Sequence, residues 1–213
     1  MKILILGAAG QIAVKLTDLL LEETDINLVL YARHGEQRIT RQDHRVNVIS
    51  GDFLEKEKLI LAMKDIDAVY LNDMGNTEAV KIIVEAMQEV GIKRFIGASI
   101  LGIYDEVVGK FGEWNHAMIG TSPRMQAQKD SAKVVEESNL DYILLRLTWL
   151  YNQPKNEAYA LSLKGTPFKG AQVAREAVAR LIADLLTGKI SYDKESLGVY
   201  EPGTELFPKP TFY

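Results

Sequence analysis

The strongest constraint on the fold of this chain is a regular alternation of short aliphatic runs with segments of helical spacing. Between the runs, apolar residues recur at the three- and four-residue intervals of one helix face, as from Ile12 to Leu20. Strands read as continuous apolar runs when helices cover both faces of a parallel sheet. We therefore predict an α/β fold, with a Rossmann-like, doubly wound parallel sheet in a three-layer α/β/α arrangement. The strand-sized runs are Lys2 to Leu6, Asn27 to Tyr31, Val46 to Ser50, Ala68 to Leu71, Arg94 to Ala98 and Tyr142 to Leu147.

The alternation breaks after Leu147. The stretch that follows is rich in proline and glycine, one further helix is predicted over about 174–186, and the tail from Pro202 onward is loop-rich. We expect a small irregular C-terminal region on the substrate side of the sheet. With 213 residues, 47% apolar composition and no linker-like segment, the chain is predicted to form one domain over residues 1–213.

The first predicted strand runs into a turn of small residues, GAAGQIA. Gly7 and Gly10 allow a tight turn and a close approach to the backbone, Ala13 lets the helix pack closely, and the amides that begin a helix attract an anion. Any α/β protein can leave a strand through glycine, so the motif alone is weak. Its place in the first strand–helix unit favours a dinucleotide site. The residues expected there are Gly7, Ala8, Ala9, Gly10, Gln11 and Ile12.

The second predicted strand ends in LYARHGEQR. This position in dinucleotide folds approaches the adenosine ribose, where an acid accepts hydrogen bonds from the 2′-hydroxyl and an arginine pairs with a 2′-phosphate. No acid occurs from Tyr31 to Arg33. Arg33 therefore favours NADP over NAD, and His34 or Arg38 can add positive charge. The alternative for Arg33 is a solvated surface side chain.

Two further strand ends carry polar residues at the edge where open sheets bind ligands. Asp52 is predicted to accept a hydrogen bond from the adenine amino group, with Phe53 near the ring; the alternative or additional role for Asp52 is to cap the next helix. Leu71, Asn72 and Asp73 end the fourth run. Asn72 and Asp73 either contact a ribose or cap the helix that follows.

Together these stretches resemble the NmrA-like, NAD(P)H-binding atypical short-chain dehydrogenase/reductases (SDRs) over nearly the whole chain. The resemblance implies a Rossmann-like domain that binds NADP, in a family that ranges from reductases of small molecules and flavins to redox sensors without turnover. Thr148 joins the expected cofactor-binding residues, and Arg175-Glu176 is expected to be a structural pair or a solvated helix face. The stretches that carry the resemblance are GAAGQIA, GDF, DAVY, KRFIGASILGIYDE, LDYILLRLTWL and VAREAVARLIADLL.

The same resemblance locates the catalytic positions. Classical members use a serine after the fifth strand and a tyrosine four residues before a lysine, which lowers the pKa of the tyrosine that exchanges a proton with the substrate. Ser99 and Lys129 match the serine and the lysine, but Met125 stands at the tyrosine position, and a thioether donates no proton. We expect Ser99 and Lys129 near the nicotinamide. The alternatives are a turn-forming Ser99 and a Lys129 that points to solvent.

Aromatic residues of the later chain are the remaining candidates for the site. Tyr104 could replace the missing acid, although packing of its ring onto the sheet is the more ordinary role. Phe111, Trp114, Trp149 and Tyr151 either line an apolar pocket for a flat ligand or belong to the core, and we favour the core.

The composition argues against binding to nucleic acid, to a metal ion or to a membrane. A net charge of -4 with both signs interspersed offers no basic stripe to nucleic acid. The chain has no cysteine, and His34, His44 and His116 are isolated, so no metal site is expected. No apolar run reaches about 18 residues and no signal-peptide pattern occurs, so we expect no membrane association and a cytoplasmic location.

Two functions are compatible with these residues. One is an NADPH-dependent oxidoreductase that acts on a small planar or carbonyl-bearing acceptor, such as a flavin or quinone. The other is a non-catalytic NADP(H)-binding sensor, in which Met125 reflects the loss of catalysis. A nucleotide-sugar epimerase or dehydratase is a weaker third, because that chemistry usually needs the missing tyrosine. We expect a monomer or a homodimer, and a small-molecule substrate.

Overall fold

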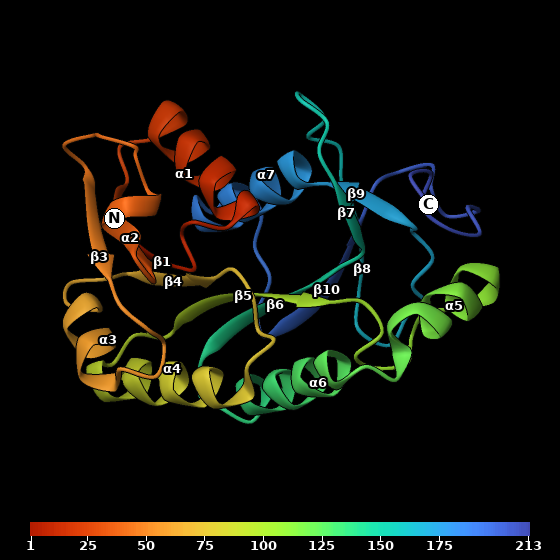
Figure 1. Ribbon diagram of the computed structural model, residues 1–213, viewed down its shortest axis with the longest axis horizontal. Coiled ribbons are helices and arrows are strands. Elements are labelled where there is room, and N and C mark those ends of the chain that lie inside the picture. The colour runs from red at the N-terminus through yellow and green to blue at the C-terminus, as the bar shows by residue number, and fades with distance from the viewer.

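The computed structural model describes all residues from Met1 to Tyr213. Its centre is a twisted sheet (Figure 1). The strand order is β3-β2-β1-β4-β5-β6-β10-β8, and every neighbouring pair is parallel except β10 with β8. The strands are β1 (Lys2–Leu6), β2 (Asn27–Ala32), β3 (Val46–Ser50), β4 (Ala68–Leu71), β5 (Arg94–Ile100), β6 (Asp141–Leu147), β8 (Ala160–Ser162) and β10 (Glu195–Tyr200), with β7 (Trp149–Tyr151) and β9 (Gln172–Ala174) in a separate parallel pair.

Helices cover both faces of the sheet, which confirms the predicted three-layer Rossmann-like fold. In Figure 1, α1 and α7 lie on one face, and α3, α4 and α6 lie on the other. None of the helices combines the length and the apolar character needed to cross a membrane. The helices are α1 (Gln11–Glu23), α2 (Gly35–Arg38), α3 (Lys56–Ala62), α4 (Thr77–Val90), α5 (Gly109–Asn115), α6 (Pro123–Glu136) and α7 (Arg175–Leu186), with a π-helical turn over His116–Gly120 after α5.

The first strand shows why the sequence runs are continuously apolar. Ile3 and Ile5 belong to the core beneath α1 and α7, whereas Leu4 and Leu6 belong to the core beneath α3, α4 and α6. All four side chains are fully buried. A strand with helices on both faces has no solvent side, so no alternation with polar residues is selected.

The region after Leu147 is more regular than the sequence suggests. It contains four short strands, of which β10 extends the main sheet parallel to β6. A glycine in mid-strand lowers the local strand propensity. Gly198 nevertheless belongs there, because an added Cβ would lie 2.3 Å from Ser162 Oγ and 2.5 Å from the Phe168 ring.

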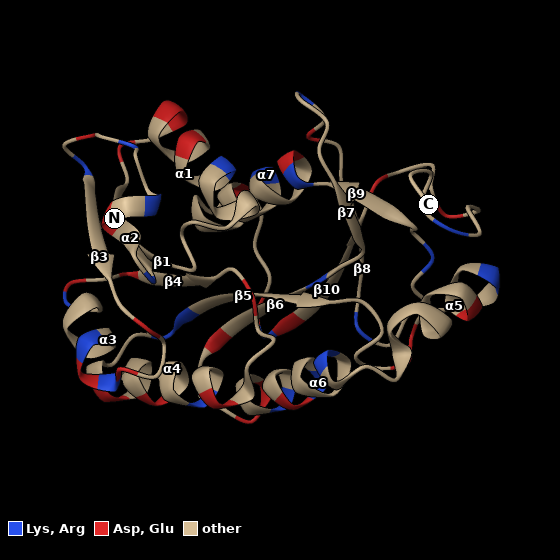
Figure 2. Cartoon of the chain, in the orientation of Figure 1, with Lys and Arg blue, Asp and Glu red and all other residues tan.

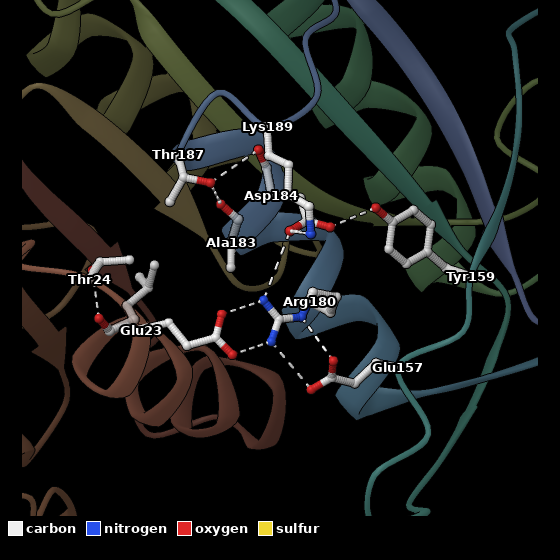
Figure 3. A network of polar contacts seen from close by, with 10 residues as sticks. Glu23, Thr24, Glu157, Tyr159, Arg180, Ala183, Asp184, Thr187 and Lys189 are labelled. Carbon is white, nitrogen blue, oxygen red and sulfur yellow. Dashed lines mark hydrogen bonds and ion pairs between the residues drawn. The ribbon is translucent and has the colours of Figure 1, made fainter.

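An ion-pair network joins the two helices on the α1 face, as Figure 3 shows. Arg180 on α7 donates through Nη1 to Glu23 on α1 at 2.7 Å and through Nε to Glu157 at 3.0 Å. One turn on, the buried Asp184 accepts from the Tyr159 hydroxyl at 2.8 Å and from Lys189 Nζ at 3.2 Å. The network therefore fixes α1, α7 and the segment between β7 and β8 to one another.

Candidate functional site

A cleft of about 440 Å³ opens beside the carboxyl ends of β1, β2 and β4. We call it the larger cleft, and its volume lies within the usual range for small-molecule sites. Parallel strands bring the residues that follow them to one edge of the sheet, so positions far apart in the sequence meet here. The predicted residues that line it are Gly7, Ala9, Gly10, Arg33, Asp52, Phe53, Leu71, Asn72 and Asp73. Ala8 is buried beside the turn and does not line it.

The glycine turn that lines the larger cleft allows a ligand to approach the backbone closely. Gly7 has a φ of +81°, in the left-handed region that favours glycine. An added Cβ on Gly10 would lie 2.2 Å from Asn72 Nδ2, so any larger residue would displace that side chain. Gly10 is also the N-cap of α1, where no side chain caps the helix and no acid stands in the first turn. The first amides of α1 are therefore suited to hold an anion.

Two arginines line the larger cleft just after β2. Arg33 and Arg38 both line it, and neither guanidinium has a carboxylate within 4.0 Å. No acid ends β2, as the sequence shows. This part of the cleft is positively charged and has no counter-ion from the protein, which fits a phosphate better than a hydroxyl.

Asp52 and Phe53 form the wall next to these arginines. Asp52 Oδ1 accepts from the Leu54 amide at 3.0 Å, which closes a local turn. The N-cap of α3 is Glu55, so the alternative of Asp52 as the helix cap is wrong. The Phe53 ring stacks on Tyr31 with 6.0 Å between centroids, and the Tyr31 hydroxyl donates to the Asp52 carbonyl at 2.8 Å. Burial raises the pKa of Tyr31, which keeps this donor protonated.

Asn72 and Asp73 are likewise not helix caps. Asn76 caps α4 and accepts from the Ala79 amide at 3.1 Å. Asn72 Oδ1 instead accepts from the Tyr70 hydroxyl at 3.0 Å, which fixes its side chain at the junction of two cavities.

A second cavity of about 270 Å³ adjoins the larger cleft and shares Asn72 and Asp73 with it. We call it the smaller cavity. It lies between the start of α1, the ends of β5 and β6, and the first turns of α6 and α7. The residues that line it are Gln11, Ile12, Asn72, Asp73, Ala98, Ser99, Ile100, Arg124, Leu147, Thr148, Leu150 and Arg175. The predicted residues among them are thus Gln11, Ile12, Asn72, Asp73, Ser99 and Thr148.

A chain of hydrogen bonds connects Ser99 to the mouth of the smaller cavity. Ser99 Oγ donates to Gln128 Oε1 at 3.0 Å, and Gln128 Nε2 donates to Asp73 Oδ1 at 2.9 Å. Arg124 Nη2 donates to the same Asp73 oxygen at 2.8 Å. Because its proton is used on the fully buried Gln128, Ser99 presents lone pairs to the cavity. Thr148 is fixed in turn by donating to the Gly170 carbonyl at 2.8 Å.

Lys129 lies apart from both cavities. Its Nζ is 2.8 Å from Asp105 Oδ1, and it lines neither the larger cleft nor the smaller cavity. Met125, at the tyrosine position, is buried in the core beneath α4 and α6. The serine, tyrosine and lysine positions of the classical members are therefore not gathered around one point in this structure.

The other aromatic candidates also lie outside the two cavities. The Tyr104 hydroxyl donates to Glu136 Oε1 at 2.6 Å, and burial raises the pKa of Tyr104. The ring centroids of Trp114 and Trp149 are 4.8 Å apart, and Tyr213 packs edge-on to Trp149 at 4.9 Å. These rings pack in the C-terminal region, and none of them lines the larger cleft or the smaller cavity.

Three polar residues that line or support the smaller cavity, Arg124, Gln128 and Arg175, were not predicted to belong to it. Arg124 and Gln128 stand four apart on α6, a spacing that places them on one helix face and is a usable signal. The sequence predicts that Arg175-Glu176 is either a structural pair or a solvated helix face. Glu176 instead contacts Lys15 Nζ at 2.7 Å, while Arg175 turns to the smaller cavity.

Comparison with known proteins identifies the family. Residues 7–189 match the model of a family described as NAD(P)H-binding. An SDR of the wide type from Veillonella parvula DSM 2008, solved in complex with NADP, is 39% identical; 99% of each chain is covered and the TM-score is 0.94. A Rossmann-fold NAD(P)-binding family protein from Shigella flexneri is 30% identical over 100% of this chain and 98% of that chain, with a TM-score of 0.81.

A curated relative agrees with this grouping. "Uncharacterized sugar epimerase YhfK" of Bacillus subtilis (strain 168) is 27% identical over 167 residues, which is 72% of this chain and 74% of that protein. The glycine turn, the strand order and the family match lead to one conclusion: this chain belongs to the NAD(P)H-binding family and is an NAD(P)-binding protein of the SDR type.

Proposed function

We propose that this protein is an NADPH-dependent oxidoreductase that reduces a small planar or carbonyl acceptor of the flavin or quinone type. The observation that carries the proposal is the larger cleft, which is lined both by the glycine turn and by two arginines without a carboxylate partner. The NADP complex of the Veillonella relative supports the choice of cofactor. Bound NADPH would supply a hydride.

In this proposal the larger cleft holds the phosphates and the adenosine. Arg33, with Arg38 beside it, pairs with the 2′-phosphate, because a planar guanidinium matches phosphate oxygens. Asp52 and Phe53 form the adenine wall, and Leu71, Asn72 and Asp73 lie along the ribose. The residues that surround the pyrophosphate are Gly7, Ala8, Ala9, Gly10, Gln11 and Ile12.

The smaller cavity is then the place of the nicotinamide and the acceptor. Ser99 and Thr148 are the polar groups of its floor, and Ser99 offers lone pairs to the carboxamide or to the acceptor. Lys129 joins this site only after leaving Asp105. Since Met125 supplies no proton, we infer that orientation of the two reactants provides most of the rate advantage and that water protonates the product.

A non-catalytic redox sensor is the second candidate. The observation that favours it is the pair of departures at the catalytic positions, a buried Met125 and a Lys129 held by Asp105. A sensor would bind NADP(H) in the larger cleft and need no acceptor in the smaller cavity.

Steady NADPH oxidation separates the two functions. The purified protein is mixed with NADPH and, in turn, with aldehydes, quinones and flavins, and the loss of NADPH absorbance is followed. Turnover with one acceptor class, reduced at least tenfold by Ser99→Ala, is the expected result. Tight NADP binding without turnover on any acceptor supports the sensor instead.

A further inference from the structure

We propose that the smaller cavity binds the carboxylate of an anionic acceptor, with Arg175 as its main anchor and Arg124 as a second contact. The inference rests on the proposed function and narrows the acceptor to a planar molecule that carries a carboxylate. The evidence for this inference is the charged side chains that line the smaller cavity.

Arg175 is a half-buried guanidinium without a counter-ion. No carboxylate lies within 4.0 Å of it, and its one polar contact is a long hydrogen bond to Asn152 Oδ1 at 3.4 Å. The adjacent Glu176 forms its ion pair with Lys15. Burial lowers the pKa of Arg175, which reflects the loss of water around the charge. A partly desolvated charge without a partner is costly, and an anionic ligand would remove that cost.

The position of this arginine on its helix adds a second cost. Arg175 is the first residue of α7, and its N-cap, Ala174, offers no capping side chain. The N-terminus of a helix is its positive end, where a cation is unfavourable and an anion is favoured. Arg124 is the second residue of α6 and stands at the positive end of that helix. Two cations thus lie at the N-terminal ends of two helices that line one cavity, and only Arg124 has a carboxylate partner there, Asp73.

The remaining lining residues suit a flat molecule with one charged end. Asp73 is the only acid that lines the smaller cavity, and its Oδ1 already accepts from Arg124 and Gln128. The two arginines therefore leave a net positive charge. Ile12 and Leu150 offer apolar surface for a ring.

The pyrophosphate of the cofactor is the other possible source of an anion. Asn152 connects Arg175 to the first residue of α1, since Asn152 Nδ2 donates to Gln11 Oε1 at 3.0 Å. We favour the acceptor, because Arg175 lines the smaller cavity with Ser99 and Thr148 and does not line the larger cleft with the glycine turn.

Benzoate and benzamide provide a direct test, since they have the same shape and differ in charge. Binding of each to the NADP⁺-loaded protein is measured by ligand-observed NMR titration at constant ionic strength, and NADP⁺ affinity is measured by calorimetry on the same samples. The variants are R175Q, R175K and R124Q. The matched control is R41Q, because Arg41 is an exposed arginine that contacts only Asp18, at 3.2 Å.

The wild type and R41Q should bind benzoate at least roughly tenfold more tightly than benzamide. R175Q should abolish that preference, R124Q should reduce it, and R175K should retain part of it, each with benzamide and NADP⁺ affinity changed by less than about twofold. A wild type without preference for benzoate would overturn the proposal. So would an R175Q variant that loses NADP⁺ affinity and keeps the benzoate preference, since the guanidinium would then serve the cofactor. A protein that fails to bind NADP⁺ contradicts the proposed function instead, and the calorimetry reports that outcome separately.

Discussion

In the proposed function, Arg33 is the residue on which the choice between the two pyridine nucleotides depends. It lines the larger cleft where β2 ends, and no carboxylate competes for it. The same position with an acid would accept from a ribose 2′-hydroxyl and repel a phosphate. We therefore propose that selectivity for NADP depends on this one charged side chain, whose position is set by the end of β2.

We expect Arg33→Ala to weaken NADPH binding at least roughly tenfold, because charge-assisted hydrogen bonds are worth about 1.5–3 kcal/mol. NADH binding should change by less than about twofold, since the lost partner is the 2′-phosphate. Fluorescence titrations with both nucleotides measure the effect, with Arg41→Ala as the control. An equal loss of affinity for both nucleotides would show that Arg33 does not bind the 2′-phosphate.

Substitution of Gly7 by alanine tests the role of the glycine turn, and the same substitution at Gly188 is a matched control. Both have positive φ, +81° and +75°, so alanine at either should cost about 1–2 kcal/mol in the free energy of unfolding. A Cβ on Gly7 would lie 3.2 Å from Asn72 Cβ at the edge of the larger cleft, whereas one on Gly188 would meet nothing within 4 Å. Urea unfolding should show a similar loss in the free energy of unfolding for both variants. Only Gly7→Ala should weaken NADP⁺ binding. Unchanged NADP⁺ affinity in Gly7→Ala would argue against pyrophosphate at the turn.

At the scale of elements, a buried ion pair holds the loop after β5 that leads into α5. Arg146 on β6 is fully buried and donates through Nη1 to Glu106 Oε1 at 2.8 Å. Glu106 also accepts from the amides of Gly102 and Tyr104, each at 3.0 Å. One carboxylate thus fixes this loop to β6, which also supplies Leu147 to the smaller cavity.

Removing only the acid of this pair should be more damaging than replacing both partners. Glu106→Ala leaves Arg146 charged and buried, which should cost about 3–5 kcal/mol in the free energy of unfolding. Adding Arg146→Met should recover part of that loss, because the uncompensated charge is gone. Urea unfolding of wild type, both single variants and the double variant completes the cycle. If the loss in the free energy of unfolding of the double variant equals the sum of the losses of the two single variants, Glu106 and Arg146 act independently.

The network of Figure 3 predicts a pH-dependent stability that originates between α1 and α7. The hydrogen bond from Arg180 lowers the pKa of Glu23 below its ordinary 4.5. A carboxyl group with a lowered folded pKa contributes stability above its unfolded pKa, and that contribution is lost as pH falls through the folded value. Because Glu23 is half exposed, we expect Arg180→Gln to cost only about 1 kcal/mol at neutral pH.

The difference between wild type and Arg180→Gln should therefore shrink once the pH falls below 4.5. Urea unfolding at several pH values measures it. Arg41→Gln, which removes one exposed pair, should change stability by less than about 0.5 kcal/mol at every pH. A difference between wild type and Arg180→Gln that stays constant through the acid range would assign the effect of Arg180 to packing.

At the scale of the whole molecule, the sequence predicts the sheet better than the surroundings of the smaller cavity. β1, β3 and β4 have the predicted bounds, and β2, β5 and β6 are one or two residues longer. A strand buried on both faces has a strong local signal. β10 was missed because Gly198 interrupts its apolar run, and the close packing of Ser162 and Phe168 that explains the glycine is visible only in the structure.

The two cavities were predictable to different degrees. The larger cleft consists of residues that directly follow strands, so the order of the strands places them. The directions of Arg175, Gln128 and Lys129 depend on how α6 and α7 dock, which no local pattern encodes. Basic and acidic residues also alternate along the chain, as the colours of Figure 2 show, so charge did not single out the two arginines of the smaller cavity.

Calorimetric titration of the folded wild-type protein with NADP⁺ and with NAD⁺ tests the central claim most directly. The larger cleft should bind NADP⁺ with one site per chain and at least about tenfold more tightly than NAD⁺. Absence of heat with either nucleotide, or tighter binding of NAD⁺, would contradict the account.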